Sequence, residues 1–148
     1  MTLAEAIQRP IAELLPHAAP MILLDRAVQA DGQAFSAEVD IRPSSLFHQK
    51  GGVPAWIGLE YMAQTAAARS GAVALVQGRP QGSGMLVGSR NFRALQALFP
   101  DGQTLRVTVH EFASQEGGLQ VMDCRIDDPS GKTLALARLN LLKTEVAS

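Results

Sequence analysis

The stretch that decides the fold begins at His48, ends at Val76 and reads HQKGGVPAWIGLEYMAQTAAARSGAVALV. Pro54 suits the first turn of a helix, where its missing N–H costs no hydrogen bond. The residues that follow are rich in Ala, Leu, Met, Glu and Gln, which are good helix formers. Gly78 and Pro80 then end the helical pattern. The sequence therefore predicts one long helix from about Pro54 to Val76.

This predicted helix is apolar on nearly all sides, whereas a helix at a protein surface normally has one charged face. Only Glu60, Gln64, Arg69 and a few small polar residues interrupt the apolar surface. A membrane span needs roughly 20 apolar residues with few charges, and Glu60 and Arg69 divide this stretch. We therefore expect the helix to be enclosed by the rest of the protein.

Glu60 is the first candidate for a functional residue. An ionised carboxylate is rarely buried without a partner. Gln64 follows one helical turn later on the same face and could donate a hydrogen bond to it. His48, in the loop before the helix, could also approach it.

Length and composition fit a single domain over residues 1–148. The chain is 47% hydrophobic and 18% charged, which allows a packed core and argues against disorder. The net charge of −1 argues against a nucleic-acid partner. Cys124 is the single cysteine, which excludes an intrachain disulfide and a multi-cysteine metal site. The first residues lack the pattern of a secretory signal, so we expect a cytoplasmic protein without a membrane partner.

The rest of the chain reads mainly as strands. Two short helical pieces are predicted between Leu3 and Leu15, because Pro10 interrupts a helical spacing. Apolar alternation and turn residues predict six strands, over residues 21–29, 34–41, 85–95, 104–114, 119–127 and 133–143. Six strands and one apolar helix predict an α+β fold in which a curved antiparallel sheet wraps around the helix.

Three motifs resemble signatures of the β-hydroxyacyl-acyl-carrier-protein dehydratases of the FabA/FabZ type. The motifs are Leu15-Pro-His17 with Asp25-Arg26, the segment from Pro54 through Glu60 to Gln64, and Val87-Gly88 with Asn91-Phe92-Arg93. The resemblance covers nearly the whole chain and implies the hot-dog fold, which agrees with the architecture predicted above.

The chain departs from the family pattern around its active-site motif. His48-Gln-Lys-Gly51 replaces the usual His-Phe-Pro-Gly, and the loop that leads to Pro54 is two residues shorter than usual. Ala55 stands where the family has a glycine. In this respect the chain looks like the divergent dehydratases of aryl-polyene and related pigment pathways.

The resemblance implies dehydration of a 3-hydroxyacyl thioester to the trans-2-enoyl product. This reaction needs a base for the α-proton, for which His48 is suited, and an acid for the leaving hydroxyl. A carboxyl group in apolar surroundings can hold a proton at neutral pH, so Glu60 is the candidate acid or orients the hydroxyl through water. His48 of one protomer would meet Glu60 of the other. The expected substrate-binding residues are Pro54, Ala55, Trp56 and Gln64, with backbone N–H groups near Ala55 and Trp56 polarising the thioester carbonyl.

The resemblance also implies partners. The substrate would be carried on the phosphopantetheine arm of an acyl carrier protein, with Arg90 and Arg93 facing that protein's acidic surface. The chain would form a homodimer or a higher oligomer, or a heterodimer with a related dehydratase. No metal and no redox cofactor is required.

Two other functions stay open at this stage: an acyl thioesterase on the same fold, and a non-catalytic hot-dog subunit that pairs with an active dehydratase. Structural roles also compete with functional ones. We expect structural roles for His17, Asp25 and Arg26. For Trp56, Tyr61 and Met62 we expect core packing rather than the lining of an acyl tunnel.

Overall fold

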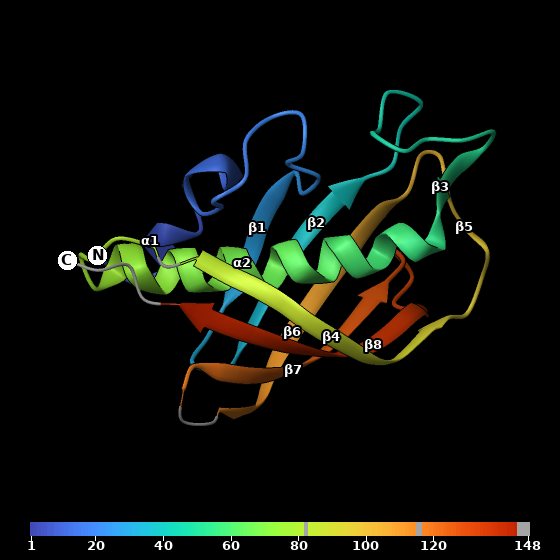
Figure 1. Ribbon diagram of the computed structural model, residues 1–148. Coiled ribbons are helices and arrows are strands. Elements are labelled where there is room, and N and C mark those ends of the chain that lie inside the picture. Colours follow the sequence, from blue (N-terminus) through green and yellow to red (C-terminus); the bar gives the residue numbers. More distant parts are fainter. Residues whose placement is uncertain (82, 115–116, 145–148) are drawn as a thin grey trace.

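The computed structural model describes residues 1–81, 83–114 and 117–144. One long helix, α2 (Gly58–Val76), lies in the concave side of a curved antiparallel sheet (Figure 1). In the sheet's order across its width, the strands are β1 (Arg26–Ala30), β2 (Ala34–Asp40), β6 (Thr104–Ser114), β7 (Leu119–Asp127), β8 (Thr133–Thr144) and β4 (Ser83–Ala94). This arrangement is the α+β hot-dog architecture predicted from the sequence.

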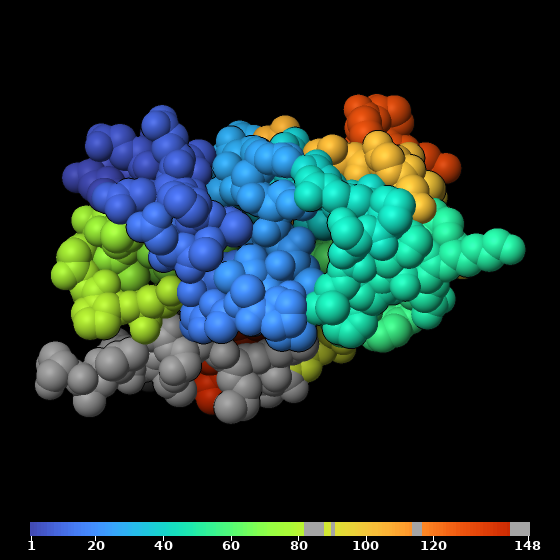
Figure 2. Space-filling model, turned by 90° about the horizontal axis from the view of Figure 1, so that it is seen from above, coloured from blue at the N-terminus to red at the C-terminus, as the bar shows by residue number. Residues whose placement is uncertain are grey.

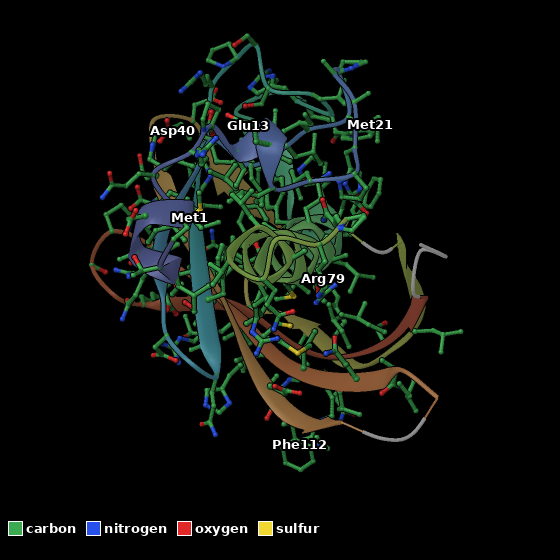
Figure 3. The ribbon with its side chains drawn as sticks, turned by 90° about the vertical axis from the view of Figure 1, so that its left-hand side faces the viewer. Met1, Glu13, Met21, Asp40, Arg79 and Phe112 are labelled. Carbon is green, nitrogen blue, oxygen red and sulfur yellow. The ribbon has the colours of Figure 1, made fainter. Side chains whose placement is uncertain are left out.

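Alternation of side chains determines which face of the sheet meets the helix. In β6, Leu105, Val107 and Val109 are fully buried, whereas Arg106 and His110 are exposed. The buried set therefore faces α2 and the exposed set faces solvent, as expected for a half-buried strand. Seen end-on, the sheet curves around α2, and Phe112 points outward from the opposite face (Figure 3).

Small residues on α2 allow close packing on the side that the sheet leaves open. The N-terminal segment covers this side with α1 (Leu3–Ala6) and the short 3₁₀ helix η1 (Ile11–Glu13). Seen from above, the N-terminal residues cover one end of this face and the segment after β2 covers the other (Figure 2). A Cβ atom on Gly71 would lie 2.0 Å from the backbone oxygen of Leu14, so only glycine permits this approach.

The structure confirms most of the predicted elements. The bounds predicted for β6 and β7 are correct, and the N-terminal pieces are short helices as expected. The predicted long helix begins instead with a 3₁₀ turn, η2 (Ala55–Ile57). None of the helices in the described part of the chain combines the length and the hydrophobicity that a membrane span requires.

Two parts of the prediction are wrong. Residues 21–25 are not a strand. Within this segment the side chain of Gln64 accepts a hydrogen bond from Leu23 N–H and donates one to the Met21 carbonyl, and so occupies two backbone groups that a neighbouring strand could otherwise bond. The sequence also gave no sign of a second, two-stranded sheet, in which β3 (Gly52–Pro54) pairs with β5 (Leu98–Pro100). Each of these strands has three residues, too few for a recognisable alternation.

Replacing Gly71 by alanine should destabilise the protein although alanine is the better helix former by about 1 kcal/mol. The added methyl group meets the rigid backbone at Leu14, and such overpacking typically costs about 1–3 kcal/mol. Because the clash is with backbone, which cannot rotate away, the cost belongs at the upper end of that range, about 2–3 kcal/mol. After the gain of about 1 kcal/mol in helix propensity is subtracted, we expect the free energy of unfolding, measured by denaturant titration, to fall by about 1–2 kcal/mol.

Gly32→Ala is the matched control, since a Cβ atom there has no neighbour within 4 Å. Its effect should stay within about 0.5 kcal/mol. A Gly71→Ala variant as stable as the parent would contradict the close approach of the N-terminal segment to α2.

Candidate active site

Gln64 connects α2 to the segment that precedes β1. Its side chain is buried on the helix, and its Oε1 accepts a hydrogen bond from Leu23 N–H at 2.9 Å. Its Nε2 donates to the carbonyl oxygen of Met21 at 2.7 Å and to Oε1 of Glu60 at 3.1 Å. Because both ends of the amide are bonded to backbone groups, the orientation of Gln64 is fixed, and one N–H is directed at Glu60.

Glu60 lies at the surface of the chain rather than in its interior. Its side chain is 39% exposed, so the expectation of an enclosed carboxylate is wrong for the single chain. Besides Gln64, the imidazole of His17 approaches it, with Nε2 3.8 Å from Oε1. The other ring nitrogen of His17, Nδ1, is buried without a hydrogen-bond partner. Both neighbours contact Oε1, and among the described residues no hydrogen bond or ion pair is found at Oε2 of Glu60.

His48 forms a second imidazole–carboxylate pair elsewhere. Its Nε2 lies 2.8 Å from Oδ1 and 3.1 Å from Oδ2 of Asp101, which is 53 residues away in the sequence. Within the described part of the chain, no hydrogen bond or ion pair joins His48 to Glu60. One chain therefore carries two separate pairs, His48–Asp101 and His17–Glu60. The predicted meeting of His48 and Glu60 between protomers stays a prediction.

The residues predicted to bind substrate precede α2. Pro54 ends β3, and Ala55 is buried with its N–H donated to the carbonyl oxygen of Ala97 at 3.0 Å. The N–H of Ala55 is thus already bonded, whereas Trp56 N–H lies in the first turn, where backbone donors lack intrahelical acceptors. Trp56 is 64% exposed, so the core packing expected for it is wrong in the single chain. Its ring centroid is 6.5 Å from that of Phe47.

The two predicted carrier-protein contacts lie on β4. Arg93 is exposed, at a bulge where it pairs in register with Leu136 of β8. The side chain of Arg90 lies outside the described residues. The role of both arginines stays a prediction.

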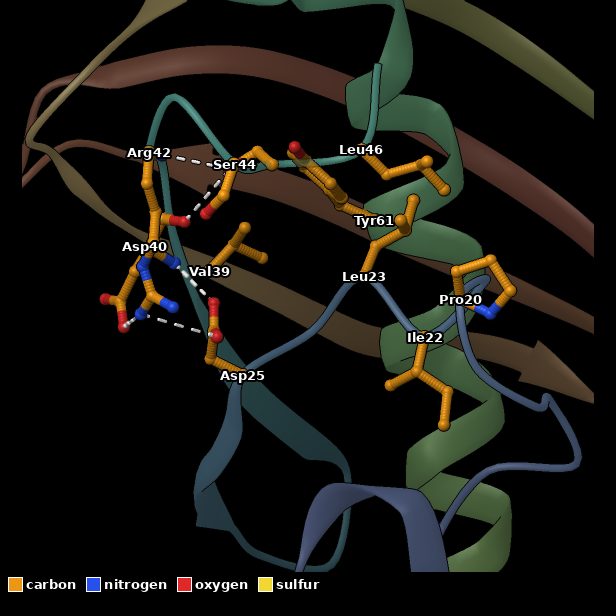
Figure 4. A pocket seen from close by; sticks show the side chains of 11 residues that line it. Pro20, Ile22, Leu23, Asp25, Val39, Asp40, Arg42, Ser44, Leu46 and Tyr61 are labelled. Atoms are coloured by element: carbon orange, nitrogen blue, oxygen red, sulfur yellow. Dashed lines mark hydrogen bonds and ion pairs between the residues drawn. The ribbon is translucent and has the colours of Figure 1, made fainter. Parts of the chain in front are cut away.

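A pocket of about 260 Å³ lies between α2 and the loop that leads from β2 to His48 (Figure 4). Tyr61 reaches into it from α2, and burial raises the pKa of its phenol. Asp25 also lines the pocket. Its Oδ2 accepts a hydrogen bond from Asp40 N–H at 2.6 Å, and its Oδ1 lies 3.7 Å from Nη2 of Arg42. Tyr61 and Met62 are both buried in the hydrophobic core, as expected from the sequence.

Ionic contacts support the structural role expected for the Asp25-Arg26 motif. The Arg26 guanidinium pairs with Glu38 at 2.8 Å and also with Asp40. This contact lowers the pKa of Asp40 below its usual range. The motif therefore fastens the start of β1 to the end of β2.

Sequence reasoning did not identify Asp101 as a site residue. Asp101 and Gly102 form a turn, and nothing in the sequence places this turn beside His48. His17 lies beside Glu60, and the structural role expected for it stays a prediction.

Comparison with known proteins identifies the family. A model of the ApeP-like family, described as ApeP dehydratase, matches residues 9–148. The chain belongs to the ApeP-like dehydratase family. The ApeP-like chain is also similar to a solved structure titled the dehydratase heterocomplex ApeI:P from Xenorhabdus doucetiae, with 25% identity, a TM-score of 0.85, and coverage of 93% of this chain and 92% of that one.

More distant structures share the fold alone. A hypothetical thioesterase with coenzyme A from Streptococcus pneumoniae is 15% identical, with a TM-score of 0.66 over 83% of the ApeP-like chain and 88% of its own. The PaaI protein of Escherichia coli is 16% identical, with a TM-score of 0.61 over 78% and 80%. No curated protein matches the sequence.

The family match favours dehydration over thioester hydrolysis for the ApeP-like chain. Dehydration is the reaction of the family, whereas the thioesterases resemble the chain only in fold. Cys124 offers no nucleophile for acyl transfer, since it is buried and burial raises the pKa of its thiol to about 12.

Replacing Gln64 by methionine should destabilise the ApeP-like chain. The substitution keeps the volume similar but leaves Leu23 N–H and the Met21 carbonyl without their side-chain partner. An unsatisfied buried polar group costs about 1–3 kcal/mol, so the free energy of unfolding should fall by about that amount in a denaturant titration. Gln8→Met, at an exposed position, is the control and should change little. Equal stability of the two variants would contradict the bridging role of Gln64.

Proposed function

We propose that the chain takes part in the dehydration of a 3-hydroxyacyl group to the trans-2-enoyl product, in aryl-polyene or related fatty-acid-like biosynthesis. The substrate is a thioester on the phosphopantetheine arm of an acyl carrier protein, whose acidic surface faces Arg90 and Arg93. The observation that carries this proposal is the family match over residues 9–148. The likeness to a dehydratase heterocomplex adds support.

The site residues have distinct roles in this reaction. His48 removes the α-proton of the acyl group. Glu60 protonates the leaving hydroxyl through Oε2, while Gln64 holds Oε1. Trp56 N–H, with the positive end of the helix dipole, polarises the thioester carbonyl.

A second hot-dog subunit completes the site. In the sheet of one chain, β4 is a twelve-residue edge strand, and an edge of this length favours pairing with another strand. Phe47 and Trp56 are 41% and 64% exposed, as expected for apolar residues that a partner covers. The named heterocomplex supports a related dehydratase as the partner, and a second copy of this chain is the alternative.

The proposal is tested by purifying the chain alone and together with a related dehydratase subunit. Each preparation receives a 3-hydroxyacyl carrier protein, and mass spectrometry follows the loss of one water. His48→Ala and Glu60→Gln should each lower the turnover of the active preparation by about 10²- to 10⁴-fold, the usual contribution of an acid or base. His110→Ala, at an exposed position on β6, is the control and should keep full turnover.

The outcomes separate the three functions. Unchanged turnover in both site variants would show that this chain is a non-catalytic subunit of an active partner. Release of the free carrier thiol, without an enoyl product, would instead show a thioesterase.

A further inference from the structure

The His48–Asp101 pair determines which nitrogen of His48 is free to react. Both carboxylate oxygens of Asp101 lie within hydrogen-bond distance of Nε2, at 2.8 and 3.1 Å. An ionised carboxylate only accepts hydrogen bonds, so Nε2 must carry the hydrogen. In a neutral imidazole the lone pair is then on Nδ1.

Nδ1 is open in the chain. Across residues 1–81, 83–114 and 117–144, no hydrogen bond to His48 Nδ1 is found, and this atom is not among the buried polar atoms that lack a partner. Nδ1 is therefore not fully buried, and the His48 side chain as a whole is 20% exposed.

Backbone hydrogen bonds fix the positions of His48 and Asp101 relative to each other. Asp101 N–H donates to the carbonyl oxygen of Gly51 at 3.0 Å, directly after the β3–β5 ladder. The loop beyond His48 is closed by two reciprocal bonds between Gln49 and Gly52, at 2.7 and 3.2 Å. A Cβ atom on Gly52 would lie 2.0 Å from the oxygen of Phe99, so the ladder fits only glycine there. The pair is thus built by the fold, unlike a contact between two flexible surface side chains.

We propose that Asp101 is the positioning residue of His48 and that Nδ1 of His48 is the atom that accepts the α-proton. This inference rests on the proposed function, in which His48 is the base. The α C–H bond breaks, its proton moves to Nδ1, and its electron pair forms the new double bond. The β C–O bond breaks, and the hydroxyl leaves as water with the proton of Glu60.

Asp101 acts at two stages of this sequence. Before the reaction it keeps the hydrogen on Nε2 and so keeps the Nδ1 lone pair available. After proton transfer, its negative charge stabilises the imidazolium that forms, as a buried carboxylate does in the Ser-His-Asp triad. The imidazolium then returns its proton to solvent, and Glu60 takes up a proton for the next turnover.

Steady-state kinetics of Asp101→Asn in the active complex test the inference. An amide can present either end to Nε2, so it no longer fixes the tautomer. We expect kcat to fall at least about 10-fold, with KM changing by less than about 3-fold, because the lost effect belongs to the transition state. Asp101→Glu should recover part of the loss. Asp123→Asn is the matched control, since Asp123 pairs with Arg138 on the outer face of the sheet, and its kcat should not change.

A spectroscopic readout separates positioning from activity. Nitrogen NMR of histidine-labelled complex, with His48 assigned from the His48→Ala variant, reports which ring nitrogen carries the hydrogen when the imidazole is neutral. The wild type should show the Nε2–H tautomer, and Asp101→Asn a mixture. A wild-type Nδ1–H tautomer, or an unchanged kcat in Asp101→Asn, would overturn the inference. If the wild-type complex shows no dehydration, both the proposed function and the role of Nδ1 are wrong. If the complex is active but kcat is unchanged in Asp101→Asn, only the inference about Asp101 and Nδ1 is wrong.

Discussion

The enclosure of α2 is the constraint on which the rest of the structure depends. The helix has no charged face, so it is stable only where the sheet and the N-terminal segment remove its apolar surface from water. Ala66, Ala68 and Ala72 are at most 4% exposed, and their small side chains let the sheet approach closely. Enclosure also obliges the polar groups on α2 to find partners within the protein.

These partners position the candidate active site. Thr65 satisfies its hydroxyl within the helix, by donating to the Tyr61 carbonyl at 2.7 Å. Gln64 instead reaches across to the segment before β1, and its remaining N–H holds Glu60 at the helix surface. Gln64 therefore both connects α2 to the segment before β1 and orients Glu60, the proposed acid. The proposed base depends on a different part of the fold, the β3–β5 ladder, so the two groups are positioned independently.

The pattern of residues predicts the elements of this fold well and its long-range contacts poorly. Half-buried strands alternate, and for that reason the bounds of β6 and β7 were predicted correctly. The apolar residues 21–24 resemble a strand, but the side chain of Gln64 bonds the backbone of Met21 and Leu23. Gln64 lies 41 residues after Leu23, so no local sequence pattern predicts this contact. Likewise, the two strands that bring Asp101 next to His48, β3 and β5, have only three residues each, so the sequence pattern does not predict this contact.

The candidate site was predicted in part. The sequence correctly paired Gln64 with Glu60, because residues four apart share a helix face. It wrongly expected Glu60 to be enclosed by its own chain, since an all-apolar pattern does not tell which side of a helix the fold leaves open. That open side, with Trp56 close by in sequence, is where the proposed second subunit is expected to bind.

The central claim is that this chain supplies a working proton-transfer site and does more than support a partner. Single-turnover dehydration by a complex whose second subunit lacks its own active-site histidine tests this most directly, because His48 is then the remaining base. If His48 is a working base, the enoyl product still forms, and it disappears when His48 is also replaced. A complex that forms normally but yields no enoyl product from the unaltered chain would show that His48 does not act as the base.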